Sequence, residues 1–217
     1  MNKIIPHQNL INFYKEGFFP MAEESSSEII NLYKPRKRFL IPINNFHVPK
    51  KLYKLFKKNN YTFRVNNDFK NVISQCQLSN RKDGSTWIND IILHSYINLH
   101  KCNICHSIEC YDEQKLVGGL YGVHIGGCFF GESMFSKVSN TSKFCLLYLI
   151  AILKKNLFSI LDSQFYNSHL IQFGAYEIDN EKYLKKLKAS IGFKRSFIFI
   201  EDFQEVLSLL HPSNHKS

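Results

Sequence analysis

LVGGLYGVHIGGCFFGESMFS, residues 116–136, is the stretch of the sequence that most directly indicates both a fold and a site. Its two strand-like runs, Leu116–Ile125 and Cys128–Phe135, are separated by Gly126-Gly127, a dipeptide suited to the positive φ values of a two-residue hairpin turn. Further glycines inside the runs are typical of bulges or of the close approach of another backbone or a ligand. The lone acid, Glu132, must pair or take part in chemistry, because burying an isolated carboxylate is costly.

The segments on either side of this hairpin predict an α+β protein. The patterns predict helices over 50–58, 86–100, 141–155 and 180–190, and strands over 106–111, 159–162 and 193–200. Three antiparallel strands followed by helix, strand, helix and strand is the order found in the N-acetyltransferases. We therefore expect an acetyltransferase-like (GNAT-type) domain with a mixed sheet over residues 61–217, preceded by a small basic α/β domain over residues 1–60.

The connection into the predicted central helix differs from that of the acetyl-CoA enzymes. Those enzymes hold the pyrophosphate of coenzyme A with a glycine-rich turn, whereas residues 136–141 here read SKVSNT, without a glycine. The scaffold therefore favours acyl transfer, and the missing turn argues against acyl-CoA as the donor. An acyl-CoA acetyltransferase stays as an alternative that saturable coenzyme A binding would favour.

The formal charge of +10 over 217 residues is concentrated in one segment. Between Ile29 and Asn67 there is no acidic residue and there are ten basic ones: Lys34, Arg36, Lys37, Arg38, Lys50, Lys51, Lys54, Lys57, Lys58 and Arg64. A solvated basic face is one reading of this composition. An uncompensated stretch that includes aromatic residues is more typical of a surface for a polyanion, and we favour contact with nucleic-acid phosphates.

The composition also bears on compartment and metal binding. No apolar run has the length that a bilayer requires, and the N-terminus lacks the features of a signal peptide, so we expect a cytosolic protein without a membrane partner. Cys102-x-x-Cys105-His106 matches a haem-attachment pattern, but the second ligand pair that a structural zinc site usually needs is missing. We expect reduced thiols, no metal and a monomer.

A series of short motifs resembles one bacterial enzyme family, the leucyl/phenylalanyl-tRNA–protein transferases, in the order that the family shows them. The motifs are Gly17-x-Phe19-Pro20-Met21, Gly84-x-Thr86-Trp87-Ile88, His106-Ser107-x-Glu109, Leu116-Val117-Gly118-Gly119-x-Tyr121-Gly122-Val123, Gly131-Glu132-Ser133-Met134-Phe135-Ser136, Ser142-Lys143, Asp162-x-Gln164, His169 and Gly174-Ala175. Each motif is weak alone, but together they are specific.

The resemblance implies transfer of Leu, Phe or Met from aminoacyl-tRNA to the α-amino group of proteins that begin with Arg or Lys, which marks those proteins for degradation. The aminoacyl ester is already activated, so no cofactor is implied. By resemblance, Asp162 and Gln164 would accept, orient or relay the acceptor amine, and Glu132 would bind the cationic acceptor. Without the resemblance, Asp162 and Gln164 would be read as capping groups at a strand end.

The resemblance also assigns the donor side. Trp87 and Tyr33 would stack on the terminal adenosine of the tRNA, with Tyr33 in place of the tryptophan that the family typically shows. The proposed contacts to the tRNA backbone are Lys34, Arg36, Lys37, Lys50, Lys51 and Lys54. The slot for the aminoacyl side chain would be lined by Leu120, Phe129, Leu149 and Leu153, residues that a sheet-on-helix core would also contain.

One rival function and one geometric condition complete the predictions from the sequence. A non-catalytic tRNA-binding protein is a rival reading that Tyr33 motivates, although the presence of Glu132, Asp162 and Gln164 speaks against it. Phe129 and Glu132 lie three residues apart and would face opposite sides of an ideal strand. Both can line one pocket only if Gly131 kinks or bulges the strand between them.

Overall fold

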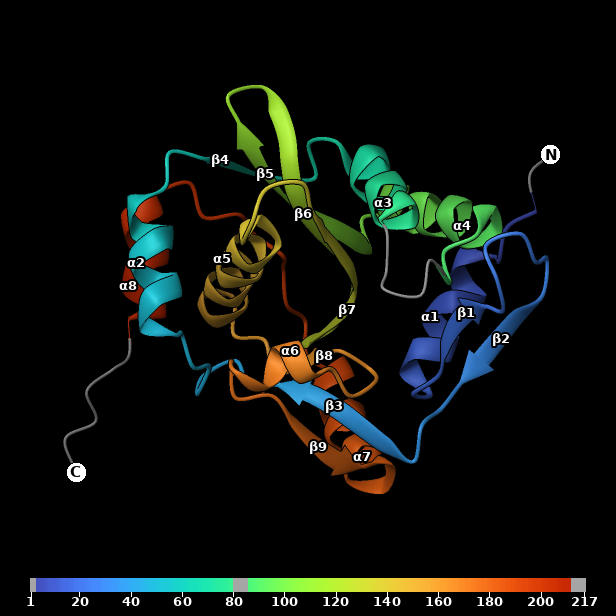
Figure 1. Cartoon of the computed structure of the whole chain (residues 1–217). Coiled ribbons are helices and arrows are strands. Elements are labelled where there is room, and N and C mark those ends of the chain that lie inside the picture. The colour runs from blue at the N-terminus through green and yellow to red at the C-terminus, as the bar shows by residue number, and fades with distance from the viewer. Residues whose placement is uncertain (1–2, 80–85, 212–217) are drawn as a thin grey trace.

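The computed structural model describes residues 3–79 and 86–211, and its centre is a seven-stranded mixed sheet (Figure 1). The strand order is β4 (Thr62–Val65), β5 (Cys105–Asp112), β6 (Lys115–Ile125), β7 (Cys128–Ser136), β8 (Ile160–Asp162), β3 (Lys37–Ile41) and β9 (Tyr176–Asp179). All neighbours are antiparallel except β7 and β8, which are parallel and are connected through the helix α5 (Thr141–Lys155). A separate two-stranded sheet pairs β1 (Phe19–Ala22) with β2 (Ile30–Tyr33).

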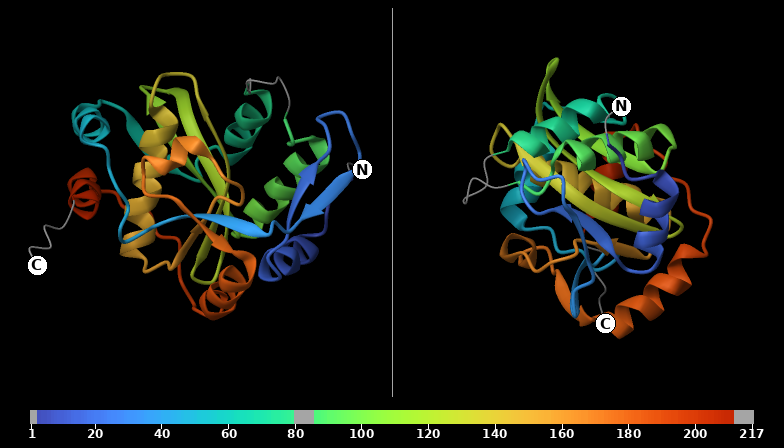
Figure 2. Two further views of the ribbon diagram at one scale, coloured as in Figure 1. Left: turned by 60° about the horizontal axis from the view of Figure 1, so that its bottom comes forward. Right: turned by 90° about the vertical axis from the view of Figure 1, so that its right-hand side faces the viewer.

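Helices cover both faces of the large sheet (Figure 2). On one face the core contains side chains of α5, α2 (Lys50–Lys58), α6 (Ser168–Ile171) and α8 (Phe203–Leu210). The core on the other face takes side chains from α1 (His7–Lys15), α3 (Phe69–Leu78), α4 (Asp90–Lys101) and α7 (Asn180–Ile191). The eleven buried residues of α5 explain why its sequence is apolar on nearly every side.

The predicted hairpin is confirmed. β6 and β7 are paired up to Ile125 and Cys128, so that Gly126 and Gly127 form a two-residue turn, and Gly126 has φ +60°. Gly118 illustrates close approach, because a Cβ there would lie 2.3 Å from the hydroxyl oxygen of Thr141 at the start of α5. Any side chain at this position would therefore push α5 away from the sheet.

A bulge interrupts β7 at Glu132, directly after Gly131. Tyr121 of β6 faces Ser133 and the next residue, Gly122, faces Gly131, which leaves Glu132 without a partner in the ladder. As a result Phe130 and Phe135, an odd number of residues apart, both point into the core on the α1–α3–α4 side. The bulge therefore reverses the alternation of the strand and takes Glu132 out of the regular pairing.

The α+β class and the acetyltransferase-like arrangement predicted from the sequence are confirmed by this topology. The predicted strand over 193–200 is wrong, because this segment has no regular secondary structure. It is held by side chains instead: Phe197 stacks on His106 and Phe129 with ring centroids 4.5 and 5.3 Å apart. The outer strand next to β3 is β9, which the sequence analysis did not predict.

The predicted domain boundary near residue 60 stays a prediction, and the contacts across it are extensive. β3 is inserted between β8 and β9 of the large sheet, and Phe56 of α2 packs on Phe144 of α5 with ring centroids 5.4 Å apart. The β1–β2 pair forms a sheet of its own, whereas α1 packs on the large sheet, with the ring centroid of Tyr14 4.8 Å from that of Phe130 in β7.

Candidate functional site

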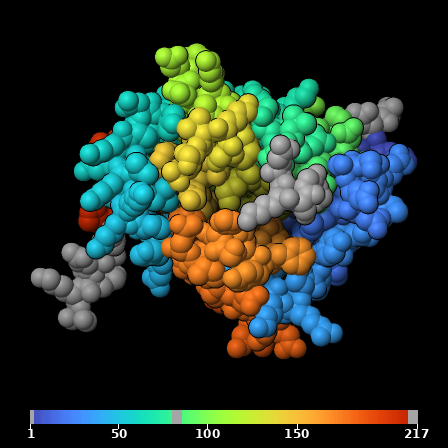
Figure 3. Space-filling view, viewed as in Figure 1, coloured from blue at the N-terminus to red at the C-terminus, as the bar shows by residue number. Residues whose placement is uncertain are grey.

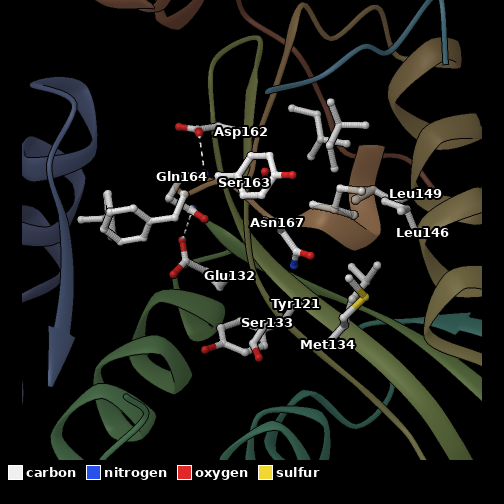
Figure 4. Close-up of a pocket in the computed structure, with 18 of the residues that line it drawn as sticks. Tyr121, Glu132, Ser133, Met134, Leu146, Leu149, Asp162, Ser163, Gln164 and Asn167 are labelled. Atoms are coloured by element: carbon white, nitrogen blue, oxygen red, sulfur yellow. Dashed lines mark hydrogen bonds between the residues drawn. The ribbon is translucent and has the colours of Figure 1, made fainter. Parts of the chain in front are cut away.

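A cavity of about 460 Å³ opens where β7, the end of β8, α5 and β1 meet (Figure 4). One part of its lining is polar and contains Glu132, Ser133, Asp162, Gln164 and Asn167. The rest is apolar, and its residues are Phe19, Met21, Ile41, Trp87, Leu120, Met134, Leu146, Leu149, Leu161, Phe165 and Leu170. The site therefore combines a hydrophobic slot with a compact group of hydrogen-bonding side chains.

Glu132, the residue displaced by the bulge, is held by two tyrosines. The Tyr14 hydroxyl donates to Oε1 at 2.7 Å, and the Tyr96 hydroxyl donates to Oε2 at 3.2 Å. These two hydroxyl oxygens also lie within hydrogen-bonding distance of each other, and both tyrosines are completely buried. Gln164 Nε2 adds a third donor to Oε1 at 3.2 Å (Figure 4). All of these donors are neutral, and no salt bridge to Glu132 occurs within the described residues.

Burial without a cationic partner raises the pKa of Glu132 to about 7. The hydrogen bonds from Tyr14 and Tyr96 oppose this shift, since they stabilise the carboxylate. A carboxyl group with a pKa near neutrality exchanges protons readily at physiological pH, which is the property that a general base needs. This shift makes Glu132 a candidate for proton transfer rather than for charge pairing alone.

Asp162 is in the opposite electrostatic situation, although it lies in the same cavity wall. The guanidinium of Arg38 contacts its carboxylate through Nε, at 3.0 and 2.9 Å from the two oxygens, and through Nη2 at 2.8 Å. The Tyr183 hydroxyl donates to Oδ2 at 2.7 Å, and the Gln164 amide N–H donates to Oδ1 at 2.9 Å. Asp162 and Arg38 are both fully buried. The Asp162 carboxylate is therefore neutralised and occupied by other groups.

Gln164 links the two carboxylates. Its backbone N–H binds Asp162 and its side chain binds Glu132, as the dashed lines in Figure 4 show. β8 ends at Asp162, and Gln164, two residues beyond it, has φ +61°, a left-handed conformation that is uncommon for a residue other than glycine. The hydrogen bond that the Gln164 N–H donates to Asp162 supports this turn and thereby directs the Gln164 side chain at Glu132.

The cavity contains two of the four residues predicted to line the aminoacyl slot. Leu120 and Leu149 line the cavity, but Phe129 and Leu153 are not among the described residues that do so. Both are fully buried in the core on the α5 side of the sheet. The bulge at Glu132 is thus present without bringing Phe129 to the cavity, because Phe129 precedes it and stays on the α5 face against Phe197.

The aromatic residues predicted for adenosine stacking lie close to one another. Trp87 lines the cavity. Tyr33 is adjacent to it: its ring stacks on Phe19 at 6.1 Å and meets Phe165 edge-on at 6.1 Å, and both of those residues are in the lining. Gly84, a member of one family motif, lies outside the described residues.

The lysines and arginines predicted to bind the tRNA backbone fall in two places. Lys34, Arg36 and Lys37 are exposed in or beside the connection from β2 to β3, directly after Tyr33. Lys50, Lys51 and Lys54 are exposed on α2, whose side chains form one flank of the molecule next to α5 in Figure 3. Arg38, which the composition grouped with these, is buried against Asp162 and belongs to the site instead.

Four residues of the site were missed by the sequence analysis as parts of the cluster: Tyr14, Tyr96, Arg38 and Tyr183. Tyr14 lies 118 residues before Glu132, and Arg38 lies 124 residues before Asp162. The one available signal was that the segment from Ile29 to Asn67 has no acid, so that a buried cation there needed a distant carboxylate.

The described part of the chain offers neither a metal-ligand cluster nor a membrane-spanning helix. It contains no group of three or more His, Cys, Asp or Glu residues able to hold a metal ion, and Cys102 and Cys105 are free thiols. No helix in residues 3–79 and 86–211 has the length and apolar character to cross a membrane.

Comparisons with known proteins place this site in a family. The sequence pattern of the family described as Leucyl/phenylalanyl-tRNA protein transferase matches residues 40–188. A protein of that name from Zymomonas mobilis is 42% identical over 191 residues, covering 88% of this chain and 71% of the relative. A protein of the same name from Maricaulis maris is 40% identical over 195 residues, covering 90% of each chain.

Among solved structures, FemX has a similar fold, with a TM-score of 0.53 at 12% identity over 83% of this chain and 70% of FemX. The family pattern and the two relatives decide the assignment, since they span most of the sequence including the hairpin, Glu132 and Asp162. The chain belongs to the leucyl/phenylalanyl-tRNA protein transferase family, and it is a transferase enzyme.

Proposed function

We propose that this protein transfers Leu, Phe or Met from aminoacyl-tRNA to the α-amino group of a protein or peptide that begins with Arg or Lys. We further propose that it acts as a monomer in the cytosol, where aminoacyl-tRNA is made and used. The aminoacyl ester is itself activated, so the reaction needs no cofactor. The product is a polypeptide longer by one residue, whose new N-terminus would mark it for degradation.

One observation carries the proposal: a single cavity holds an apolar slot, an exposed aromatic cluster and a carboxylate with a pKa near 7. The slot, with Leu120, Leu149 and Leu161, suits an aliphatic or aromatic side chain. The aromatic cluster suits a nucleobase. The carboxylate of Glu132 suits an ammonium group, because the other acid of the lining is already bound to Arg38.

Glu132 is the group to which we assign the acceptor amine. An α-ammonium group has an ordinary pKa of about 7.7–8.0 and must lose a proton before it can attack. The ionised Glu132 would bind the ammonium and accept that proton, and the freed nitrogen would form a bond to the ester carbonyl carbon. The bond from that carbon to the ribose oxygen then breaks, and the ribose oxygen takes up the excess proton that the bonded nitrogen releases as the tRNA leaves.

Of the roles that the resemblance implies for Asp162, which are to accept, orient or relay the acceptor amine, this proposal keeps a positioning role only. Its oxygens are already bound by Arg38, Tyr183 and the Gln164 amide, so no lone pair is oriented for a substrate amine. Gln164 would orient the acceptor together with Glu132, because its side-chain amide lies within hydrogen-bonding distance of that carboxylate.

On the donor side we keep Trp87 and Tyr33 as the partners of the terminal adenosine. Lys34, Arg36 and Lys37 would then meet the first phosphates, and Lys50, Lys51 and Lys54 of α2 the more distant backbone. Such contacts release counterions, so the affinity for tRNA should fall steeply as salt increases.

The deciding experiment incubates the protein with labelled Leu-tRNA and a peptide that begins with Arg, and follows the label into the peptide. A matched peptide that begins with Met, and the Glu132→Gln variant, serve as controls. We expect transfer only with the wild-type protein and the Arg peptide. Absence of transfer, or equal transfer to the Met peptide, would contradict the proposal.

A further inference from the structure

We propose that Phe165 is a stacking platform for the nucleotide that precedes the terminal adenosine at the single-stranded 3′ end of the donor tRNA. This inference rests on the proposed function, and it extends the donor site to a residue for which the sequence analysis had no role. It names the single-stranded end of the RNA, rather than its duplex stem, as the feature that this wall of the cavity recognises.

Phe165 is apolar and yet accessible at the cavity. This apolar ring lines the cavity and yet is 42% exposed, and the ring of Tyr33 beside it is 36% exposed. Phe165 meets Phe19 edge-on at 5.3 Å and Tyr33 edge-on at 6.1 Å. Two roughly perpendicular aromatic faces are thus presented at the mouth of one cavity, an arrangement able to hold two successive bases that are no longer stacked on each other.

The residues around Phe165 hold its ring in a fixed position. Phe19 is almost completely buried, its ring stacks with Tyr33, and the guanidinium of Arg38 lies 4.8 Å from its centroid. Arg38 is fixed in turn by Asp162, which also binds the backbone N–H of Gln164, the neighbour of Phe165 in the chain. The position of Phe165 is therefore set by the same ion pair that sets Gln164, so little order would be lost on binding.

Positively charged side chains lie beside these aromatic rings. Lys34, Arg36 and Lys37 follow Tyr33 directly and are exposed, while Lys34 Nζ lies 4.6 Å from the centroid of Phe18. Two acids of β9 lie beside Lys37: Glu177, whose carboxylate is 3.8 Å from Lys37 Nζ, and Asp179, which is the partner of Lys37 in the ladder. An exposed aromatic face next to a predominantly cationic turn is the combination by which proteins hold single-stranded nucleic acid. An apolar polypeptide segment would use the aromatic face but not the cations.

The test compares three donors that share the leucyl ester: Leu-tRNA, the trinucleotide CCA carrying leucine on its 3′ adenosine, and leucyl-adenosine. Two variants separate shape from stacking. Phe165→Leu keeps an apolar side chain against Phe19 without an aromatic face, and Phe165→Tyr keeps the face. Tyr176→Leu is the matched control, because Tyr176 is 40% exposed on the edge strand β9 and is not among the described residues that line the cavity.

We expect Phe165→Leu to raise KM about 5- to 100-fold for Leu-tRNA and for leucyl-CCA, with little change in kcat. The KM for leucyl-adenosine should stay unchanged, Phe165→Tyr should restore the values, and Tyr176→Leu should have no effect. An equal rise for leucyl-adenosine would overturn the proposal, since Phe165 would then belong to the adenosine or aminoacyl site. Unchanged KM values for all donors would overturn it as well.

Binding of uncharged CCA and of adenosine, measured by titration calorimetry, keeps this inference separate from the proposed function. If the wild-type protein transferred no leucine from any donor, the proposed function would fail, but CCA binding could still be measured. A fall in CCA affinity of the same size in Phe165→Leu, with adenosine affinity unchanged, would support the platform. No difference between variant and wild type would overturn it.

Discussion

Two carboxylates of one cavity, Asp162 and Glu132, are bridged by Gln164 but differ in almost every physical respect. Asp162 is bound by a buried guanidinium, a tyrosine and a backbone amide, and these partners neutralise it. Glu132 is bound by neutral donors, and burial raises its pKa to about 7. The difference teaches that the acid with the stronger partners stabilises the site, whereas the acid left without a cation is available for chemistry.

The largest expected effect is on Asp162. Replacing Asp162 with Asn leaves the Arg38 guanidinium buried without a counter-charge, and removing one partner of a buried pair costs about 3–5 kcal/mol. The free energy of unfolding from denaturant titration checks this value. The matched control is Glu205→Gln, which breaks the exposed Lys155–Glu205 pair at 2.8 Å and should cost less than about 1 kcal/mol. Equal losses of unfolding free energy in the two variants would mean that Asp162 stabilises the protein no more than an exposed ion pair does, contrary to the structural role given to it here.

Next in size is the loss of activity in Glu132→Gln. This substitution keeps the shape and a hydrogen-bond acceptor for Tyr14 but removes the basic carboxylate, so kcat should fall about 10²- to 10⁴-fold. At pH 8 the circular dichroism spectrum should match that of the wild type, and the unfolding midpoint should be equal or higher. Retention of full activity would assign proton transfer to another group.

How far the sequence predicted this site depends on which contacts are local. The hairpin was predictable because Gly126-Gly127 lies between two apolar runs. The bulge was inferred only on the condition that Phe129 and Glu132 share a pocket, and it is present although Phe129 stays in the core on the α5 side. The tyrosines around Glu132 were not predictable, since Tyr14 is brought to it only by packing across the sheet from 118 residues away. The same reasoning explains Arg38, whose local sequence differs little from that of its exposed neighbours.

The errors in the fold prediction have a similar origin. Residues 193–200 contain apolar residues that read as a strand, but the edge of the sheet beside β3 is taken by β9, whose apolar–polar alternation, Tyr176-Glu177-Ile178-Asp179, covers only four residues. Competition between segments for one edge cannot be read from either segment alone.

One motif of the family is also structural: buried Glu109 accepts hydrogen bonds from the Ser107 hydroxyl at 2.7 Å and from the Asp68 amide at 2.9 Å.

A smaller effect is expected in the pH dependence of stability. The folded protein raises the pKa of Glu132 from 4.5 to about 7, so between these values the folded state binds more protons than the unfolded state. Glu132 therefore lowers stability as pH rises from 4.5 to 7, by about 1–3 kcal/mol in total. Unfolding curves at pH 5 and pH 8 should show this difference for the wild type and a smaller one for Glu132→Gln. Identical differences would mean that Glu132 titrates near its ordinary pKa.

The smallest expected effect sharpens the comparison most, because it changes only the partners of Glu132. The Tyr14 hydroxyl stabilises the Glu132 carboxylate and so lowers its pKa, and Tyr14→Phe should shift that pKa upward while Tyr96 and Gln164 still donate. The rise of kcat/KM with pH should then occur at higher pH than in the wild type, with little loss at the plateau. Tyr183→Phe removes the equivalent hydroxyl from Asp162 and should leave the position of this rise unchanged. If the two variants shifted the profile equally, Asp162 and Glu132 would titrate as one unit, and the division of roles between them would be wrong.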